Sequence, residues 1–152
     1  MNDWIAETLQ PNGTLKNKFK IKDSGYLAQL ERRITRIRFE EISQENIVIS
    51  DIGDLAKLHQ QLFGDLYDWA GKFREGNFGK GNTEFFPYER FQYAEQNLNN
   101  QIERINTTNY QTKFTLSDDL GKLLTDINQF HPFHEGNGRT QRLFIILLAK
   151  QK

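Results

Sequence analysis

The chain has 152 residues, a length that fits one domain able to bury a hydrophobic core without covalent staples. It contains no cysteine, which excludes disulfide scaffolds and thiolate zinc sites. Its 20 basic and 20 acidic residues balance, so we expect no direct nucleic-acid partner and no membrane partner. The longest apolar stretch, 143–149, is far below the roughly 20 residues of a membrane helix. The amino terminus lacks the order of a signal peptide, which favours a cytoplasmic protein.

Helical spacing of apolar residues organises most of the chain. Residues 1–22 are polar and contain the turn signal Pro11-Asn12-Gly13, so we expect an arm lying on the surface. Helices are predicted near 25–41 behind a Ser24 cap, from Asp54 to Leu66, from Pro87 to Ile105, behind Ser117 to Phe130, and from Gly138 to the C-terminus. Since no linker or repeat interrupts this pattern, residues 23–152 are predicted to form one domain.

The segment between Gly71 and Pro87 differs from the helical stretches. Two short aromatic runs surround the turn signal Gly79-Lys80-Gly81-Asn82, which predicts a small β-hairpin. An isolated hairpin is marginal in water, so this one is expected to pack against the helices.

The candidate functional residues lie in one stretch, His131 to Arg142, with the sequence His-Pro-Phe-His-Glu-Gly-Asn-Gly-Arg-Thr-Gln-Arg. Pro132 biases the preceding residue away from helical backbone, so the helix is predicted to end at Phe130 and to present His131 at a loop edge. Glycines on both sides of Asn137, just before a new helix, allow positive φ and direct backbone N–H groups into an anion-binding nest.

Charged side chains complete this stretch. Arg139 and Arg142 lie three residues apart, hence on one helix face, and both can reach phosphate oxygens. Glu135 places a hard carboxylate oxygen where a phosphate-bound Mg²⁺ needs a protein ligand. Histidine, carboxylate, nest and paired arginines together indicate a phosphoryl-type transfer site.

The same stretch matches the motif of the Fic family, His-x-Phe-x-(Asp/Glu)-Gly-Asn-Gly-Arg-x-x-Arg, at every defined position. Upstream, residues 62–74 resemble the second landmark of that family, and the predicted hairpin follows in the place of its flap. The resemblance covers about residues 25–150. It implies an all-α Fic fold, a helical bundle with a small β-hairpin flap beside the active site.

This resemblance implies a protein adenylyltransferase, which transfers AMP from ATP to a hydroxyl side chain of a target protein. It makes His131 the base that deprotonates the hydroxyl, a contribution of typically about 10²–10⁴-fold. Glu135 is the implied ligand of the Mg²⁺ that accompanies ATP, and Phe133 is an implied core anchor. The implied phosphate-binding residues are Gly136, Asn137, Gly138, Arg139 and Arg142, of which Arg142 steadies the leaving pyrophosphate.

By order along the chain, Phe78, Lys80 and Phe85 align with the flap of the family. Such a flap pairs with an extended segment of the target, where main-chain hydrogen bonds provide affinity and side chains position the hydroxyl. These three residues are therefore the implied target-binding residues.

Other functions remain open at this point. In the Doc-like kinase branch of the fold a lysine replaces the second glycine of the motif, and Gly138 argues against that branch. Transfer of UMP or another phosphate-linked group remains possible because the motif recognises phosphates and not the base. A catalytically silent nucleotide- or peptide-binding module would be expected to have lost His131 or Glu135.

Two other histidines and a run of arginines favour structural roles. His59 lies beside Leu58 and Leu62 on an amphipathic helix, so a packing or surface role is predicted, and His134 is likewise left out of the site. The arginines between positions 32 and 38 alternate with glutamates nearby, which favours a solvated helix face over an RNA-binding surface.

Regulation is also suggested by the resemblance. Many Fic proteins are inhibited by a helix carrying (Ser/Thr)-x-x-x-Glu-(Gly/Asn), whose glutamate pairs with the second motif arginine, here Arg142. This sequence lacks that pattern, and residues 22–31 resemble toxin-type members that a small separate antitoxin inhibits. Known targets of such toxins include DNA gyrase and topoisomerase IV, which implies a growth-arresting toxin of the bacterial cytoplasm. Because the chain stops at Lys152, one helix after the motif, a lost inhibitory helix and a fold completed by a partner both stay open.

Overall fold

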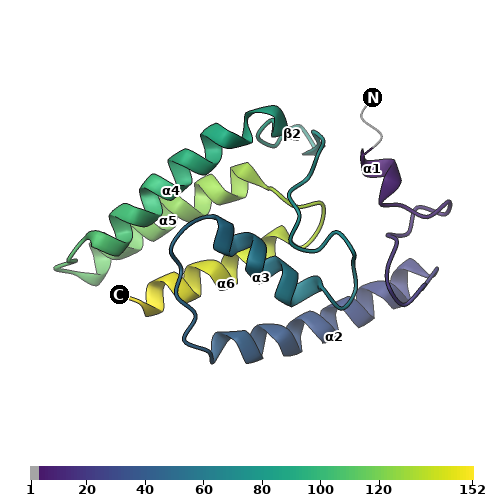
Figure 1. Cartoon of the computed structure of the whole chain (residues 1–152), viewed down its shortest axis with the longest axis horizontal. Coiled ribbons are helices and arrows are strands. Elements are labelled where there is room, and N and C mark those ends of the chain that lie inside the picture. Colours follow the sequence, from purple (N-terminus) through teal and green to yellow (C-terminus); the bar gives the residue numbers. More distant parts are fainter. Residues whose placement is uncertain (1–3) are drawn as a thin grey trace.

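The computed structural model describes residues 4–152 and is mostly helical (Figure 1). Its elements in chain order are α1 (Trp4–Glu7), α2 (Ser24–Ser43), α3 (Gly53–Phe63), β1 (Gly79–Lys80), β2 (Thr83–Glu84), the short 3₁₀ helix η1 (Tyr88–Arg90), α4 (Phe91–Thr107), α5 (Lys113–Phe130) and α6 (Asn137–Lys150). The predicted all-α architecture with one small hairpin is confirmed. Within residues 4–152, none of the helices has the length and apolar character needed to cross a membrane.

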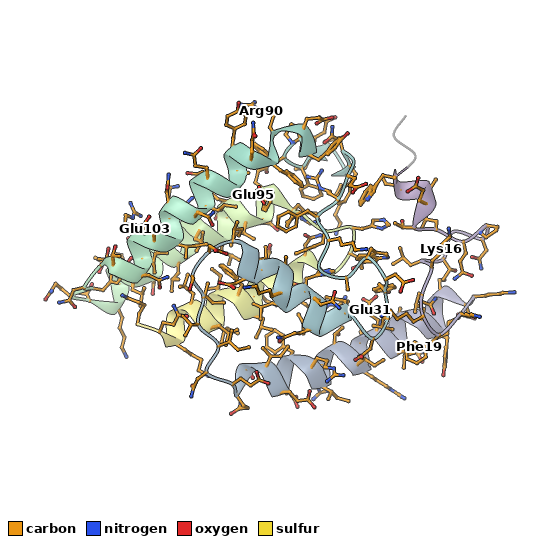
Figure 2. All side chains as sticks on the ribbon, viewed as in Figure 1. Lys16, Phe19, Glu31, Arg90, Glu95 and Glu103 are labelled. Carbon is orange, nitrogen blue, oxygen red and sulfur yellow. The ribbon has the colours of Figure 1, made fainter. Side chains whose placement is uncertain are left out.

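Helix α6 is the centre of the packing. It contacts α3, α5 and α2, while α4 lies alongside α5 (Figure 1). The side chains that fill the space around α6 have at most 1% exposure and include Leu62, Phe63, Ile127, Leu143, Phe144, Leu147 and Leu148. Charged side chains such as Lys16 and Glu103 cover outer surfaces (Figure 2). The core of the domain therefore fixes the position of α6.

Helix boundaries differ from the predicted ones where a local cap decides them. Asp23, and not Ser24, caps α2, because its Oδ1 accepts a hydrogen bond from the N–H of Tyr26 at 2.9 Å. Helix α5 begins at Lys113 and not behind Ser117, because the hydroxyl of Thr112 accepts from the N–H of Thr115 at 3.1 Å. The added first turn contains Phe114, which is 74% exposed and so breaks the apolar periodicity on which the prediction rested.

Two further helices are shorter than predicted. Helix α3 ends at Phe63, so Leu66 is buried from a turn and not from the helix. Helix α4 begins at Phe91, because the residues that follow Pro87 form the separate η1 turn. The core positions were thus identified correctly, although the backbone that carries some of them is irregular.

The predicted hairpin is confirmed. Strands β1 and β2 pair antiparallel with Gly79 opposite Glu84 and Lys80 opposite Thr83. It is fastened to α5 at Gln129, whose carbonyl accepts from the N–H of Phe86 at 3.0 Å and whose Nε2 donates to the carbonyl of Glu84 at 3.1 Å. The hairpin consequently lies over the carboxyl end of α5, as Figure 1 shows.

The amino-terminal arm has more structure than its polar composition predicted. It contains α1 and an isolated bridge between Leu9 and Leu15, and residues 1–3 lie outside the described part. The N–H of Lys18 donates to the carbonyl of Leu66 at 2.7 Å, which ties the arm to the turn after α3. The division into an arm at 1–22 and a domain at 23–152 stays a prediction.

This packing predicts an unequal response to truncation of two aliphatic side chains. Leu62→Ala removes a side chain with 0% exposure and is expected to lower the free energy of unfolding by about 2–5 kcal/mol. Ile37→Ala, at a position of 57% exposure on α2, should change it by about 0.5 kcal/mol or less. Urea titrations of both variants check this, and equal losses would contradict the placement of the core.

Candidate active site

The motif stretch forms the loop between α5 and α6 and the first turns of α6. His131 is the C-cap of α5, and its N–H still donates to the carbonyl of Ile127 at 2.9 Å. As predicted, it leaves the helix at the residue before Pro132. Its backbone is left-handed, with φ 45° and ψ 61°, and not extended as a residue before proline usually is. This uncommon conformation turns the carbonyl of His131 inward, where Nε of Arg74 donates to it at 2.8 Å.

The ring of His131 lies under the hairpin. Phe85 stacks on it with ring centroids 3.6 Å apart and planes 2° apart, and Phe78 meets its edge at 5.5 Å. Burial lowers the pKa of His131 to about 4, and the cations of Arg74 and Lys80 act in the same direction. The imidazole is therefore neutral at pH 7, the form that can accept a proton. The three predicted flap residues thus surround the predicted base, two by contact and Lys80 through its charge.

The predicted anion nest is built from one unusual glycine and a helix terminus. Gly136 has φ 82°, and a Cβ there would lie 2.3 Å from the ring of Phe63, so only glycine fits. Gly138 is part of α6 and has no positive φ, contrary to the expectation for both glycines. A Cβ at Gly138 would instead lie 3.3 Å from Nη1 of Arg142. The first N–H groups of α6 lack carbonyl partners within the helix, so they are available to an anionic ligand.

Asn137 and Phe133 hold the middle of the loop. Oδ1 of Asn137 accepts from the N–H of Phe133 at 2.9 Å, and its Nδ2 donates to the carbonyl of Phe133 at 2.7 Å. The side chain of Asn137 is therefore occupied within the protein, which leaves its backbone to face a ligand. Phe133 has 0% exposure, in agreement with its predicted role as a core anchor.

His59 supports the loop in a way that the sequence did not reveal. It has 0% exposure and stacks between Phe63 and Phe133, so the packing role is correct. Its Nδ1 accepts from the N–H of Gly71 at 2.8 Å, and because that N–H can only donate, Nε2 carries the proton and donates to the carbonyl of Glu135 at 2.8 Å. Burial lowers the pKa of His59 to about 4 and keeps it in this neutral form. One feature of the sequence could have predicted this role. A histidine on the apolar face of a helix has buried ring nitrogens, and these need hydrogen-bond partners.

The carboxylate of Glu135 is accessible, with 46% side-chain exposure. Its Oε1 accepts from the N–H of Gly136 at 3.1 Å and lies 3.8 Å from Nη2 of Arg139. No group of three or more histidine and acidic side chains in residues 4–152 is arranged to hold a metal alone. A divalent cation would need further oxygen ligands here, from bound phosphates and water, which is the usual situation for Mg²⁺.

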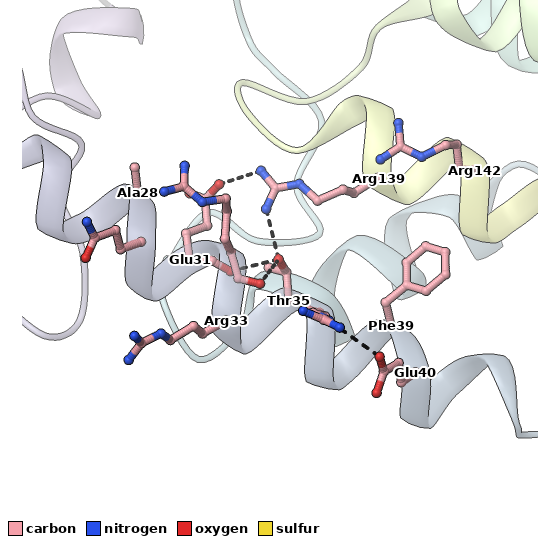
Figure 3. Close-up of a pocket in the computed structure, with 11 residues that line it drawn as sticks. Ala28, Glu31, Arg33, Thr35, Phe39, Glu40, Arg139 and Arg142 are labelled. Carbon is pink, nitrogen blue, oxygen red and sulfur yellow. Dashed lines mark hydrogen bonds and ion pairs between the residues drawn. The ribbon is translucent and has the colours of Figure 1, made fainter.

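The two motif arginines line one cavity of about 970 Å³ between α2 and α6 (Figure 3). Arg139 is turned toward α2, where Nη2 lies 2.5 Å from Oε1 of Glu31 and Nη1 donates to the hydroxyl of Thr35 at 2.9 Å. Glu31 also accepts a hydrogen bond from the buried hydroxyl of Tyr67. Arg142 is exposed to solvent in the same cavity. The sequence therefore predicted the shared face of the arginines and missed the acidic partner of Arg139.

His134 and Arg38 have the plain structural roles expected of them, whereas other members of the arginine run lie at the cavity of Arg142. Nδ1 of His134 lies 3.0 Å from the hydroxyl of Thr8, and its ring meets the edge of Trp4, so His134 joins the arm to the loop. Arg38 pairs with Asp65 at 2.9 Å at the protein surface. Other members of the run, Arg32, Arg33 and Arg36, line the cavity that contains Arg142.

Comparison with known proteins agrees with this geometry. The family model described as "Fic/DOC family" matches residues 50–149, about two thirds of the chain. The chain belongs to the Fic/DOC family.

Similar proteins within the family are longer. The chain is 34% identical over 140 residues to "Protein adenylyltransferase VbhT" of Bartonella schoenbuchensis, a match that covers 91% of this chain and 29% of that relative. It is 31% identical over 159 residues to "Probable protein adenylyltransferase Fic" of Salmonella typhimurium, covering 98% of this chain and 76% of the relative. The solved structure of the type IV secretion system effector protein BepA is similar with a TM-score of 0.84 and 30% identity, covering 96% of this chain and 55% of BepA. The chain thus spans less than a third of VbhT and about half of BepA.

The similarity to BepA confirms the Fic fold that the motif implied. In this Fic domain the motif residues come together at one end of α6, with His131 beneath the hairpin, Glu135 at the rim of the nest, and the arginines in the neighbouring cavity. The arrangement brings together a neutral imidazole, a helix amino terminus with free N–H groups and an accessible carboxylate.

The contact between Phe85 and His131 predicts a titration. In nuclear magnetic resonance spectra the imidazole of His131 should titrate near pH 4, and Phe85→Ala should move the midpoint upward toward the ordinary 6.5 because water then reaches the ring. The imidazole of His131 binds a proton more weakly in the folded state than in the unfolded chain. The free energy of unfolding should therefore decrease as the pH falls from about 6.5 toward 4. Phe114→Ala, at a site of 74% exposure, is the control. A midpoint near 6.5 in the unmodified protein would contradict the buried, neutral base.

Proposed function

We propose that this Fic domain is a protein adenylyltransferase, which transfers AMP from ATP to a hydroxyl side chain of a target protein. The observation that carries this proposal is the neutral His131 held one loop away from the anion-binding terminus of α6. Membership of the Fic/DOC family and the names of the similar proteins, which include protein adenylyltransferases, support the same reaction.

In the proposed reaction the imidazole of His131 accepts the proton of the target hydroxyl while the hydroxyl oxygen attacks the α-phosphorus of ATP. A new oxygen–phosphorus bond forms, the bond from the α-phosphorus to the oxygen bridging to the β-phosphate breaks, and pyrophosphate leaves. The backbone N–H groups of Gly136, Asn137 and Gly138, together with Arg139, bind the phosphates. Arg142 steadies the departing pyrophosphate, which acquires negative charge as the bond breaks.

Glu135 is proposed to hold Mg²⁺ together with the phosphates of ATP. Its exposed carboxylate next to the nest supports this role. The bound cation neutralises phosphate charge and favours the departure of pyrophosphate. Within the protein, the bond from Nε2 of His59 to the carbonyl of Glu135 keeps this residue at the rim of the nest.

The hairpin is proposed to receive the target. Both strands of the hairpin are exposed, and Lys80 on β1 is close enough for its charge to lower the pKa of His131. An extended segment of the target can add to the strand edge by main-chain hydrogen bonds and bring its hydroxyl toward His131. Phe78 and Phe85, which flank the two strands, contact the imidazole of His131 and are proposed to form the surface on which the modified side chain is placed.

Labelled ATP distinguishes the proposed reaction from its alternatives. Incubation of a bacterial lysate with this chain and Mg²⁺ should incorporate label from α-labelled ATP into protein and none from γ-labelled ATP. Label arriving only from the γ-phosphate would establish a kinase, and greater incorporation from labelled UTP would establish another nucleotide. No incorporation despite ATP binding would indicate a silent binding module.

Two variants separate phosphate binding from chemistry. His131→Ala should bind ATP almost normally in calorimetry and lose at least about 100-fold in transfer rate, because only the base is missing. Arg142→Ala should weaken ATP binding by about tenfold or more, because it removes a charge-assisted hydrogen bond. Equal loss of ATP affinity in the two variants would show that the roles are wrongly assigned.

We further propose that the domain acts as a toxin in the bacterial cytoplasm, with DNA gyrase or topoisomerase IV as the target and a small antitoxin as the inhibitor. The resemblance of residues 22–31 to toxin-type Fic proteins supports this setting. The cavity between α2 and α6 also supports it, because the exposed Arg142 and the arginines at 32, 33 and 36 would attract the glutamate of an inhibitory helix.

Expression in bacteria tests the toxin proposal. Production of the chain alone should slow growth and yield AMP-modified topoisomerase detectable by mass spectrometry, whereas His131→Ala should do neither at equal soluble expression. Co-expression of a small partner that presents a glutamate to Arg142 should restore growth. Unimpaired growth with unmodified topoisomerase would refute the toxin proposal and leave the transferase proposal standing.

A further inference from the structure

Arg74 is a buried cation outside the motif. It lies between α3 and the hairpin and has 2% exposure. Among residues 4–152 its guanidinium forms no ion pair, although burial of a charge is costly unless hydrogen bonds compensate for it. The compensation comes from backbone carbonyls, and their positions in the chain indicate what the side chain does.

One set of these carbonyls belongs to the end of α5 and the loop that follows it. Nε of Arg74 donates to the carbonyl of His131 at 2.8 Å, and Nη2 donates to the carbonyl of Phe130 at 3.1 Å. The backbone N–H of Arg74 donates to the carbonyl of Pro132 at 2.7 Å. Arg74 therefore binds three consecutive residues at the point where α5 ends and His131 takes its left-handed conformation.

The other set belongs to the two ends of the hairpin. Nη1 donates to the carbonyl of Gly76, before β1, at 2.6 Å, and Nη2 donates to the carbonyl of Phe86, after β2, at 2.5 Å. The guanidinium also lies 5.2 Å from the ring centre of Phe78 and 4.8 Å from that of Phe91. One planar guanidinium thus forms hydrogen bonds to both ends of the hairpin and to the loop that contains His131.

We propose that Arg74 is a positioning residue that sets the hairpin at a fixed distance from His131, so that a target segment docked on the hairpin presents its hydroxyl to the base. This inference rests on the proposed function of the hairpin and of His131. The guanidinium offers five N–H donors in a rigid fork, whereas a lysine ammonium offers three donors on a flexible stem. Displacement of a reacting group by about 1 Å can cost about 100-fold in rate, so a loosened hairpin should impair transfer strongly.

The nucleotide side of the site has a separate anchor. His59 holds the carbonyl of Glu135, and Asn137 clamps Phe133, without any hydrogen bond from Arg74 to these groups. The two anchors therefore predict opposite defects. Arg74 variants should transfer AMP to the target more slowly and keep their affinity for ATP. A His59 variant should bind ATP more weakly and keep the hairpin in place.

The experiment compares Arg74→Lys, His59→Gln and the control Arg90→Lys in the full chain. Arg90 is an exposed arginine at the end of η1 (Figure 2). Its guanidinium lies 5.6 Å from the ring of Tyr93, and the hydrogen bonds to these carbonyls come from Arg74. Three quantities are measured: hydrogen exchange of residues 76–86, affinity for Mg²⁺ and ATP by calorimetry, and incorporation of α-labelled ATP into lysate protein at saturating ATP.

In Arg74→Lys we expect hairpin exchange to rise at least tenfold, ATP affinity to stay within about twofold, and incorporation to fall by about 10- to 100-fold. His59→Gln should weaken ATP affinity with unchanged hairpin exchange, and Arg90→Lys should match the unmodified chain. If Arg74→Lys does not fold, Arg74→Gln replaces it, because a neutral amide is less costly to bury and also lacks the fork.

Unchanged hairpin exchange in a folded Arg74 variant would overturn the proposal. Exchange that rises equally in α4 and α5, with a parallel loss of ATP affinity, would also overturn it, because Arg74 would then only stabilise the whole domain. Absence of label with the unmodified chain would refute the proposed transferase function. Hairpin exchange would still decide whether Arg74 fixes the hairpin.

Discussion

The loop between α5 and α6 has to satisfy two opposing demands, and the rest of the site depends on how it meets them. It must abandon helical geometry so that His131 and the first N–H groups of α6 can take the roles proposed for them. It also lies against the core, where unpaired backbone groups are costly. Buried polar side chains resolve the conflict: Arg74 takes the carbonyls of Phe130 and His131, His59 takes that of Glu135, and Asn137 pairs with Phe133.

The surroundings of the loop also determine the electrostatic environments of His131 and Glu135. The imidazole of His131 is covered by Phe85 and has cations nearby, so its neutral form is favoured, while the carboxylate of Glu135, four residues later, is open to solvent. His131 and Glu135 thereby have different environments in one loop, which suit the different tasks proposed for them. One can take a proton at neutral pH, and the other can share a divalent cation with phosphates.

Much of this could be predicted from the sequence because the information is local. Periodicity located the helices that carry the core, and the spacing within 131–142 placed base, carboxylate and nest in one loop. Local signals failed where a single hydroxyl caps a helix, as Thr112 does for α5. They failed more seriously for long-range partners. Glu31 meets Arg139 across 108 positions of sequence, and Arg74 meets His131 across 57. No spacing rule connects such residues, because only the packing of α2 and of the segment after α3 against α6 and its preceding loop brings them together.

We propose that the loop between α5 and α6 is already shaped for phosphate before ATP binds. Crystal structures of the chain without ligand and with Mg²⁺ and a non-hydrolysable ATP analogue test it most directly. We expect the backbone of residues 130–142 to superimpose within about 1 Å, with phosphate oxygens on the N–H groups at the start of α6 and the cation on Glu135. A loop that rearranges around the nucleotide, or phosphates bound away from the terminus of α6, would contradict the account.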